Sequence, residues 1–313
     1  MWKSVISPIF SILCLLIALA FLNNSFNRFY GITSSAKSIF IKNPYGIVYL
    51  HPYNISDSWF LTELGIYKRT SLWQKNITVL KPQIEQDLQL IKQTGYKWVV
   101  IFPRCNLNVS QVCENVEWFS NKTHEYGLEL IVVCCGGWSY YNTSTPEYQN
   151  ILWALGNISQ FEYVKYVSSY SSTDNATEWW VWYQTLDSSI KAKYIPHVDA
   201  PYLNNYKIIY SLGFDSEKYV LLEAYTEEKA IECSYFKKAY VLIGQWRGSA
   251  TPSDQIKGIE NKIGICEKYR QFETFYGVWC FDDTEQLAED GDYGIYFPYE
   301  PYLLIPSHIV EVS

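Results

Sequence analysis

Short apolar runs that alternate with helix-like segments are the feature that most constrains the fold of this chain. Most runs are continuous, as expected for strands that are buried on both faces. We place eight strands at residues 46–50, 97–102, 129–135, 162–167, 192–196, 218–224, 239–244 and 275–281. Helix patterns occupy residues 81–94, 112–126, 178–189, 203–212, 227–237 and 253–269. This order predicts a parallel sheet that is covered by helices.

Strand and then helix, repeated eight times, predicts one fold class, the (β/α)8 or TIM barrel. The fifth unit is short, and residues 51–80 form a long connection after the first strand. The alternative is a doubly wound open α/β sheet, which normally carries a glycine-rich phosphate loop after its first strand. Residues 51–54 read His-Pro-Tyr-Asn instead, so the barrel is the preferred prediction.

An apolar segment at residues 5–22, preceded by Lys3, predicts a transmembrane helix ahead of the barrel. Eighteen helical residues reach about 27 Å, close to the thickness of the bilayer interior. The positive start places the N-terminus in the cytoplasm, so we expect a single-pass protein of the cell membrane with its C-terminal domain outside. The alternative is a cleaved signal peptide, because Ala18-Leu19-Ala20 resembles a cleavage site, and the protein would then be secreted.

Glycosylation sequons support an exported protein. Such sites are modified only on the exported side and mark surface positions. Besides the one at Asn23, sequons open at Asn54, Asn76, Asn108, Asn121, Asn142, Asn157 and Asn175. All of them precede residue 178, so glycans would crowd the first half of the chain.

The domain prediction follows from these segments. Residues 1–23 are the signal anchor or signal peptide, residues 24–44 an extracytoplasmic stem, residues 45–298 the barrel, and residues 299–313 a tail packed on the barrel. The formal net charge is −7, and no basic stripe is present, which argues against a nucleic-acid partner. The oligomeric state stays open.

Cysteine usage also fits an oxidising compartment. Seven of the eight cysteines follow the apolar segment, and none of them forms a CxxC motif, so disulfides are a better interpretation than a zinc site. We expect a local bridge between Cys105 and Cys113. Seven is an odd number, so at least one thiol remains free or pairs between molecules.

In a barrel, ligand chemistry gathers where the strands end and the connections to the helices begin. Two carboxylates at such positions, Glu223 and Asp282, are the catalytic candidates. The substrate-binding candidates combine aromatic rings with charged and amide groups, and they are Arg104, Trp138, Asp199, Tyr225, Gln245, Trp246 and Trp279. Aromatic faces stack on sugar rings while polar groups bind hydroxyls, so these residues predict a carbohydrate ligand.

Four segments carry a resemblance to the TIM-barrel glycoside hydrolase superfamily: residues 98–104, 130–138, 219–225 and 276–283. The likeness is one of architecture and strand-end chemistry. It implies two carboxylates that flank the scissile bond, one as general acid and the other as nucleophile or base, with no cofactor. Together with the predicted anchor, the resemblance implies a membrane-anchored extracytoplasmic glycoside hydrolase-like protein that acts on or binds surface polysaccharide.

Some features favour a noncatalytic alternative, a surface or virion glycoprotein that uses the barrel as a binding or structural module. The fourth strand ends without a carboxylate, although many retaining families place their acid there. Glu223 has a structural interpretation as well, since it precedes the helix that begins near Glu227. Metal catalysis is disfavoured, because the four histidines form neither an HxH nor an HExxH motif, and no GxSxG elbow is present.

Overall fold

The computed structural model describes part of the chain. The described residues are 45–49, 72–135, 145–169, 175–198, 203, 205–245, 252–269, 273–279, 296–297 and 302–303. The apolar segment at residues 5–22 and the stem lie outside these ranges. Among the described helices, none combines the length and apolarity that a membrane crossing requires.

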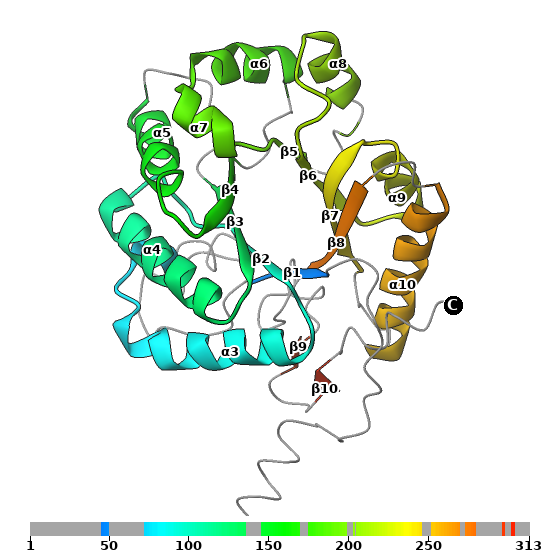
Figure 1. Ribbon diagram of the computed structural model, residues 1–313, viewed down its shortest axis with the longest axis horizontal. Helices are drawn as coiled ribbons and strands as arrows, with labels where there is room; N and C mark the ends of the chain where they lie inside the picture. Colours follow the sequence, from blue (N-terminus) through cyan, green and yellow to red (C-terminus); the bar gives the residue numbers. More distant parts are fainter. Residues whose placement is uncertain are drawn as a thin grey trace, which may run out of the picture.

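Eight parallel strands form a nearly closed barrel, as the alternation of strands and helices predicted (Figure 1). Their order in the sheet is β4-β3-β2-β1-β8-β7-β6-β5. The strands are β1 (Gly46–Val48), β2 (Trp98–Ile101), β3 (Glu129–Cys134), β4 (Val164–Ser169), β5 (His197–Val198), β6 (Val220–Ala224), β7 (Lys238–Gly244) and β8 (Glu273–Trp279).

Strands β4 and β5 stand at the two ends of this order, and the residues just before β5 join them. Val167 of β4 forms a parallel bridge with Tyr194, and the Ile195 N–H donates to the Val167 carbonyl at 2.9 Å. Since β1 lies between β2 and β8, the first and last units of the barrel are neighbours. This closure distinguishes the fold from the open doubly wound sheet that was the alternative.

Helices cover the outside of the barrel (Figure 1). They are α3 (Lys81–Gln93), α4 (Val109–Glu125), α5 (Pro146–Ile158), α6 (Ala176–Thr185), α7 (Ser188–Lys193), α8 (Asn205–Ser211), α9 (Glu227–Cys233) and α10 (Pro252–Tyr269). Two 3-10 helices, η1 (Leu72–Gln74) and η2 (Thr78–Leu80), precede α3. A short antiparallel pair, β9 (Tyr296–Phe297) and β10 (Tyr302–Leu303), follows the barrel.

Local signals account for several helix ends. The Thr145 side chain accepts the Tyr148 N–H at the start of α5, and Thr226 does the same for the Lys229 N–H in α9. Such N-caps satisfy amide groups that have no partner within the helix. Gly95, with φ of 99°, follows α3 in the left-handed region, which glycine adopts at little cost.

The strands bury both faces, and the side chains form two apolar clusters. Outward-facing residues such as Val99 and Leu130 pack beneath the helices, while Trp98, Val100 and Leu242 belong to the cluster inside the barrel. A continuous apolar strand is what this two-sided burial requires.

The Trp98 indole fills the barrel interior next to β1 and β8. Its ring lies against Tyr240 in an edge-to-face contact with centroids 5.0 Å apart. A Cβ at Gly46 would meet Trp98 at 1.9 Å, and one at Gly277 would meet it at 2.4 Å. Both positions therefore require glycine in order to accommodate the indole.

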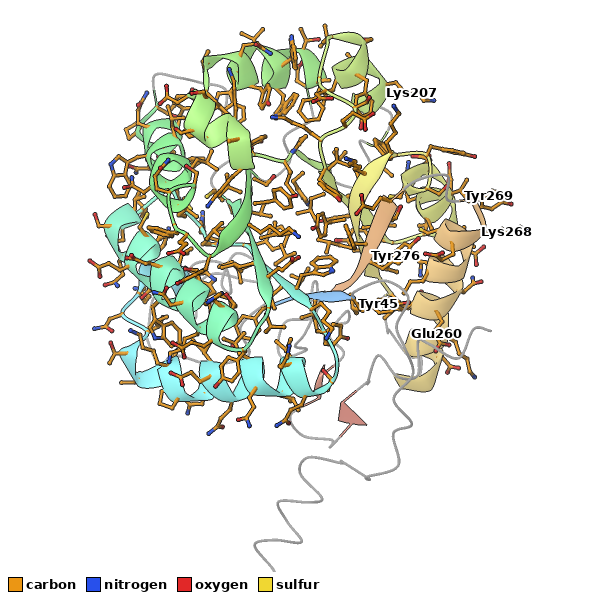
Figure 2. All side chains as sticks on the ribbon, in the orientation of Figure 1. Tyr45, Lys207, Glu260, Lys268, Tyr269 and Tyr276 are labelled. Carbon is orange, nitrogen blue, oxygen red and sulfur yellow. The ribbon has the colours of Figure 1, made fainter. Side chains whose placement is uncertain are left out.

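Outside the strands, the first and last units pack together with α10. Tyr45 precedes β1, and its ring centroid lies 6.4 Å from that of Tyr276 in β8 (Figure 2). Burial raises the pKa of the Tyr45 hydroxyl, and the nearby carboxylates of Glu267 and Glu260 on α10 add to the rise.

The structure departs from the predicted elements in the fifth unit. The predicted strand at residues 192–196 overlaps α7, and the strand itself begins later, at His197. Pro196 has no N–H to donate, which shifts regular pairing beyond it. The predicted helix at residues 178–189 is divided into α6 and α7, because Leu186 and Asp187 adopt extended conformations. Helix α5 was not among the predicted helices.

Candidate functional site

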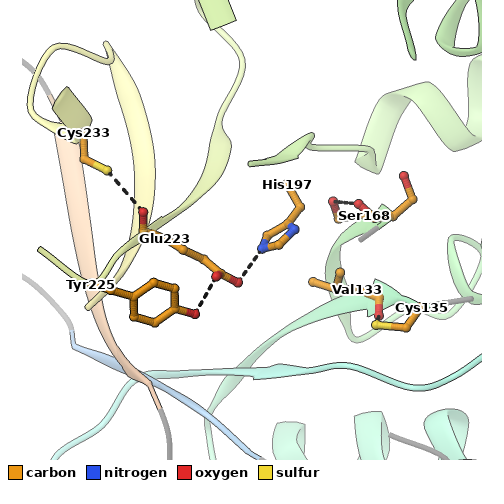
Figure 3. Close-up of polar contacts among 8 residues, drawn as sticks. Val133, Cys135, Ser168, His197, Glu223, Tyr225 and Cys233 are labelled. Carbon is orange, nitrogen blue, oxygen red and sulfur yellow. Dashed lines mark hydrogen bonds and ion pairs between the residues drawn. The ribbon is translucent and has the colours of Figure 1, made fainter. Parts of the chain in front are cut away.

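Three side chains meet at the ends of β5 and β6 (Figure 3). Nε2 of His197 lies 2.8 Å from Oε1 of Glu223, and the Tyr225 hydroxyl donates to Oε2 of Glu223 at 2.5 Å. Glu223 is 1% exposed and His197 is fully buried. A carboxylate that is bound through both oxygens in this way has a fixed orientation.

The strand pattern explains why Glu223 lies there. Leu221 belongs to the cluster inside the barrel, and side chains two residues apart point to the same face of a strand. Glu223 therefore points into the barrel from the C-terminal end of β6, and Tyr225 follows on the same side. His197 pairs in register with Leu221, which sets the imidazole beside this carboxylate.

An aromatic ring covers the histidine. The Phe102 ring contacts the His197 imidazole edge-to-face, with centroids 5.7 Å apart. Phe102 is itself buried in the cluster inside the barrel. In an apolar setting the bond between His197 and Glu223 is stronger than it is in water.

Arg104 and Cys135 extend the site toward β2 and β3. The two residues form a parallel bridge just beyond those strands, and the Gln74 amide donates to the Arg104 carbonyl at 3.0 Å. Burial raises the pKa of the Cys135 thiol well above its usual range, and negative charge on Cys134 and Glu223 adds to the rise, whereas Arg104 opposes it. The thiol is therefore neutral at pH 7, and it faces the same part of the barrel as Glu223.

The end of β4 carries two serines and no carboxylate, and Ser168 shares the inner face with Tyr166 whereas Ser169 shares the outer face with Val167. Ser169 and the Tyr194 hydroxyl share a hydrogen bond of 2.7 Å, and the Trp179 indole N–H donates to the same Tyr194 oxygen at 3.3 Å. Ser168 is fully buried and lies across the barrel from Glu223, on the far side of His197 (Figure 3).

Gln245 takes a different direction from the other strand-end candidates. It follows β7, and its Oε1 accepts a hydrogen bond from the Lys262 ammonium group of α10. Gly258 leaves the space that this side chain occupies, since a Cβ there would meet Gln245 Oε1 at 2.4 Å. Gln245 thus lies between β7 and α10 and is not grouped with Glu223.

The structure places some of the other predicted site residues. Trp279 is the last residue of β8 and pairs with Gly244. The remaining candidates, Trp138, Asp199, Trp246 and Asp282, lie outside the described residues. Of the sequence-predicted set, the structure therefore brings together Glu223 and Tyr225, with Arg104 near them through Cys135.

The predicted bridge between Cys105 and Cys113 is not formed in the structure. The six described cysteines all carry free thiols. The Cys105 thiol donates to the Pro103 carbonyl at 3.3 Å. Proximity in the sequence suggested a bridge to Cys113, but that thiol is buried on α4 as a free thiol.

Five of the predicted glycosylation sites can be located. Asn76, Asn108, Asn121 and Asn175 are exposed, and Asn157 is half-buried near the end of α5. Asn175 also caps α6 by accepting the Glu178 N–H. Asn54 and Asn142 lie outside the described residues.

Sequence reasoning missed the contribution of Cys135 and Ser168 and assigned His197 no role beside Glu223. The signal that could have found His197 was its position at the end of the fifth unit. The strand there is too short for its sequence to show which side chains face into the barrel. Within the described ranges, no group of three or more His, Cys, Asp or Glu residues has an arrangement that could hold a metal ion.

Comparison with known proteins identifies the fold of the chain but no sequence family. No protein-family model matches the chain. No curated protein matches its sequence either. Among solved structures, similar folds occur in a family 39 glycoside hydrolase from Bacteroides cellulosilyticus WH2, at 9% identity and a TM-score of 0.55 over 86% of this chain. This chain spans 64% of the length of that structure.

Two further structures are similar over nearly their full length. A GH5-4 broad-specificity endoglucanase from Clostridium longisporum aligns at 9% identity and a TM-score of 0.55, covering 86% of this chain and 94% of the other. Thermotoga maritima Cel5A aligns at 12% identity and a TM-score of 0.52, covering 85% and 97%. The chain therefore has the fold of TIM-barrel glycoside hydrolases, as its strand-end segments suggested.

Proposed function

We propose that this chain is a membrane-anchored, extracytoplasmic glycoside hydrolase-like protein that acts on surface polysaccharide at the C-terminal end of its barrel. The observation that carries the proposal is the placement of Glu223, a buried carboxylate that points into the barrel where the strands end. In TIM-barrel enzymes this end holds the active site. The similarity in fold to glycoside hydrolases supports the same chemistry.

The contacts of Glu223 assign it a role within this proposal. The Tyr225 hydroxyl donates to one oxygen of Glu223, and Nε2 of His197 lies 2.8 Å from the other, so the carboxyl group is held in one orientation. An ionised carboxylate serves as nucleophile or general base, whereas the general acid must carry a proton. In this proposal the oriented Glu223 carboxylate is the nucleophile or base, and Asp282 is the candidate for the general acid.

The location of the protein is part of the proposal. The apolar segment at residues 5–22 provides an anchor, and the exposed sequons on α4 and α6 provide accessible glycan sites. A cleaved signal peptide would place the same barrel outside the cell without an anchor.

A noncatalytic barrel that binds carbohydrate is the second candidate, and one observation favours it. Both oxygens of Glu223 are already engaged, and the side chain is almost completely buried. A carboxylate with this environment can stabilise the barrel without reacting. In this case the aromatic and polar groups at the strand ends would bind sugar without turning it over.

The test is hydrolysis by the full chain in detergent, measured on a panel of polysaccharides and aryl glycosides. If the chain is an enzyme, we expect Glu223→Gln to lower kcat by at least about 1000-fold, since the variant cannot form the covalent or base-assisted step. Glu228→Gln on α9 is the matched control, because it removes an exposed carboxylate nearby. Circular dichroism confirms that both variants are folded.

The outcomes separate the two candidates. Turnover that is lost in Glu223→Gln and retained in Glu228→Gln supports the enzyme. Sugar binding by calorimetry without turnover supports the binding module. Turnover that both variants retain would remove Glu223 from the mechanism.

A further inference from the structure

An exposed indole ring lies on the outer surface of α5, in the helical wall of the barrel. Trp153 is 47% exposed, and no other tryptophan whose side chain the structure describes is as exposed. Tryptophan side chains in folded proteins are usually buried over most of their surface. The barrel therefore leaves part of this ring uncovered, and the function proposed above does not use it.

A glycosylation sequon lies one helical turn after this indole. Asn157, Ile158 and Ser159 form the sequon. Asn157 follows Trp153 by four residues within α5, so the two side chains are neighbours on one face of the helix. Helical side chains point back toward the N-terminus and cover the preceding turn. A sugar attached to Asn157 would therefore extend over the Trp153 ring.

The Asn157 amide is already directed toward that turn. Its Nδ2 donates to the Trp153 carbonyl oxygen at 2.8 Å. The nitrogen of a primary amide carries two hydrogens, so this bond uses one of them, and a glycan replaces the other. The hydrogen bond and the sugar linkage are therefore compatible with each other.

We propose that Asn157 carries an N-linked glycan and that the first sugar of this glycan packs on the exposed face of the Trp153 indole. The proposal rests on the extracytoplasmic location within the proposed function, because such glycans are attached only on the exported side. In the reaction, Nδ2 forms a bond to the anomeric carbon of a sugar and loses one proton. The bond between that carbon and the phosphate of a lipid-linked donor breaks, and the lipid phosphate leaves with the electron pair.

The attached sugar has a physical reason to stay on the ring. The C–H groups of a sugar ring meet the negative face of the indole, and the contact removes apolar surface of both from water. Ser159 of the sequon is 3% exposed after folding, so the transfer takes place before α5 packs on the barrel. The sugar then contacts the indole as the helix forms.

The other sequon asparagine within a described helix has a different neighbour. On α4, Asn121 follows Trp118 by three residues, but this indole is half-buried. The Lys81 ammonium group also lies 4.8 Å from the centroid of the Trp118 ring. A glycan on Asn121 would have to displace this cation in order to reach the ring. Asn121 is therefore the matched control for Asn157.

The test compares the oxidation of Trp153 with and without the glycan. The full chain is purified in detergent from the membranes of a host that attaches N-glycans and is treated with hydroxyl radicals. Mass spectrometry of its peptides then gives the oxidation rate of each ring. In Asn157→Gln, we expect Trp153 to oxidise at least about twice as fast, because a stacked sugar shields one of the two faces of the indole. Asn121→Gln should leave that rate unchanged, and Tyr235, which is 59% exposed, is the internal reference.

A second sample determines which sequons carry glycans. Enzymatic release of the glycans converts each occupied asparagine to aspartate, which the same peptide analysis detects. If Asn157→Gln does not fold, Ser159→Ala takes its place, because it removes the sequon and keeps the Asn157 side chain.

The outcomes separate this proposal from the proposed function. An occupied Asn157 with equal oxidation of Trp153 in both proteins would overturn the proposal. An unoccupied Asn157 in a chain whose Asn121 carries a glycan would overturn it as well and leave the extracytoplasmic location in place. If no sequon is occupied, the proposal and that location are both contradicted. The readings require no hydrolysis, so a failure of the enzymatic function would not affect them.

Discussion

At the scale of single residues, Glu223 depends on its two neighbours. A buried carboxylate is costly unless hydrogen bonds replace its hydration, and here His197 and Tyr225 supply them. Tyr225 is only partly buried, yet it donates the shorter of the two bonds. Its hydroxyl is therefore the most direct place to perturb the site without creating a large cavity.

Removing that hydroxyl has an expected cost. Tyr225→Phe leaves one carboxylate oxygen without this donor, and we expect the free energy of unfolding to fall by about 2 kcal/mol, the usual value of a hydrogen bond to a charged group. Urea denaturation measures the change. Tyr235→Phe is the control, since Tyr235 is 59% exposed, and its free energy of unfolding should stay unchanged. Equal stabilities in the two variants would contradict the assigned role of Tyr225.

The sequence predicts the positions of Glu223 and Tyr225 correctly but not that of Gln245, and the reason is physical. Glu223 and Tyr225 could be predicted because an apolar strand ends there and the alternation of side chains directs both inward. Gln245 looked equivalent in the sequence, but it shares the outer face of β7 with Val241 and Ile243, so its side chain lies against Lys262. A shift of a single residue reverses the face, and composition does not define that shift.

At the scale of elements, helix starts were predictable only where the apolar pattern was also clear. Helix α5 begins with Thr145 and Pro146, a recognisable N-terminal signal, yet its interior mixes aromatic, polar and glycine residues. The fifth strand was misplaced because Pro196 interrupts the pairing. Strand β1 is short, pairs with both β2 and β8, and packs its Gly46 against the Trp98 indole.

Two glycine substitutions test how tightly that indole is packed. Gly46→Ala places a methyl group against Trp98, and we expect it to lower the free energy of unfolding by at least about 2 kcal/mol through overpacking. Gly264→Ala on α10 meets no atom within 4 Å, and we expect it to raise stability by about 0.5–1 kcal/mol through helix propensity. Thermal unfolding compares the two. A neutral Gly46→Ala would show that the indole can move aside.

At the scale of the whole molecule, the alternation of strands and helices was enough to predict a closed barrel. Its two apolar clusters, one inside the strands and one beneath the helices, follow from strands that are apolar on both faces. The buried thiols are a second global property. Burial raises the pKa of Cys113 and Cys266 to about 12 each, compared with about 8.5 for an exposed cysteine.

These raised pKa values predict a loss of stability in alkali. The unfolded chain releases its thiol protons near pH 9, while the folded chain keeps them until about pH 12. A raised folded pKa contributes stability that is complete below pH 9 and falls as the pH rises toward 12, by about 1.4 kcal/mol per pH unit and thiol. Urea denaturation of the reduced protein at pH 8 and pH 10 measures the slope. Cys266→Ala should make the slope shallower, and an unchanged slope would contradict the prediction.

The closure between β4 and the fifth unit has a dynamic consequence. Strands β7 and β8 align over seven residue pairs, whereas β4 meets the fifth unit through Tyr194 and Ile195. We expect amide hydrogen exchange to be faster at Ile195 than at Leu242, because the shorter ladder opens at a lower free energy. His197 lies two residues beyond this joint and stays paired with Leu221 of β6, so each opening would move the imidazole and Glu223 together, away from β4. The barrel would then widen beside the site on the timescale of local unfolding.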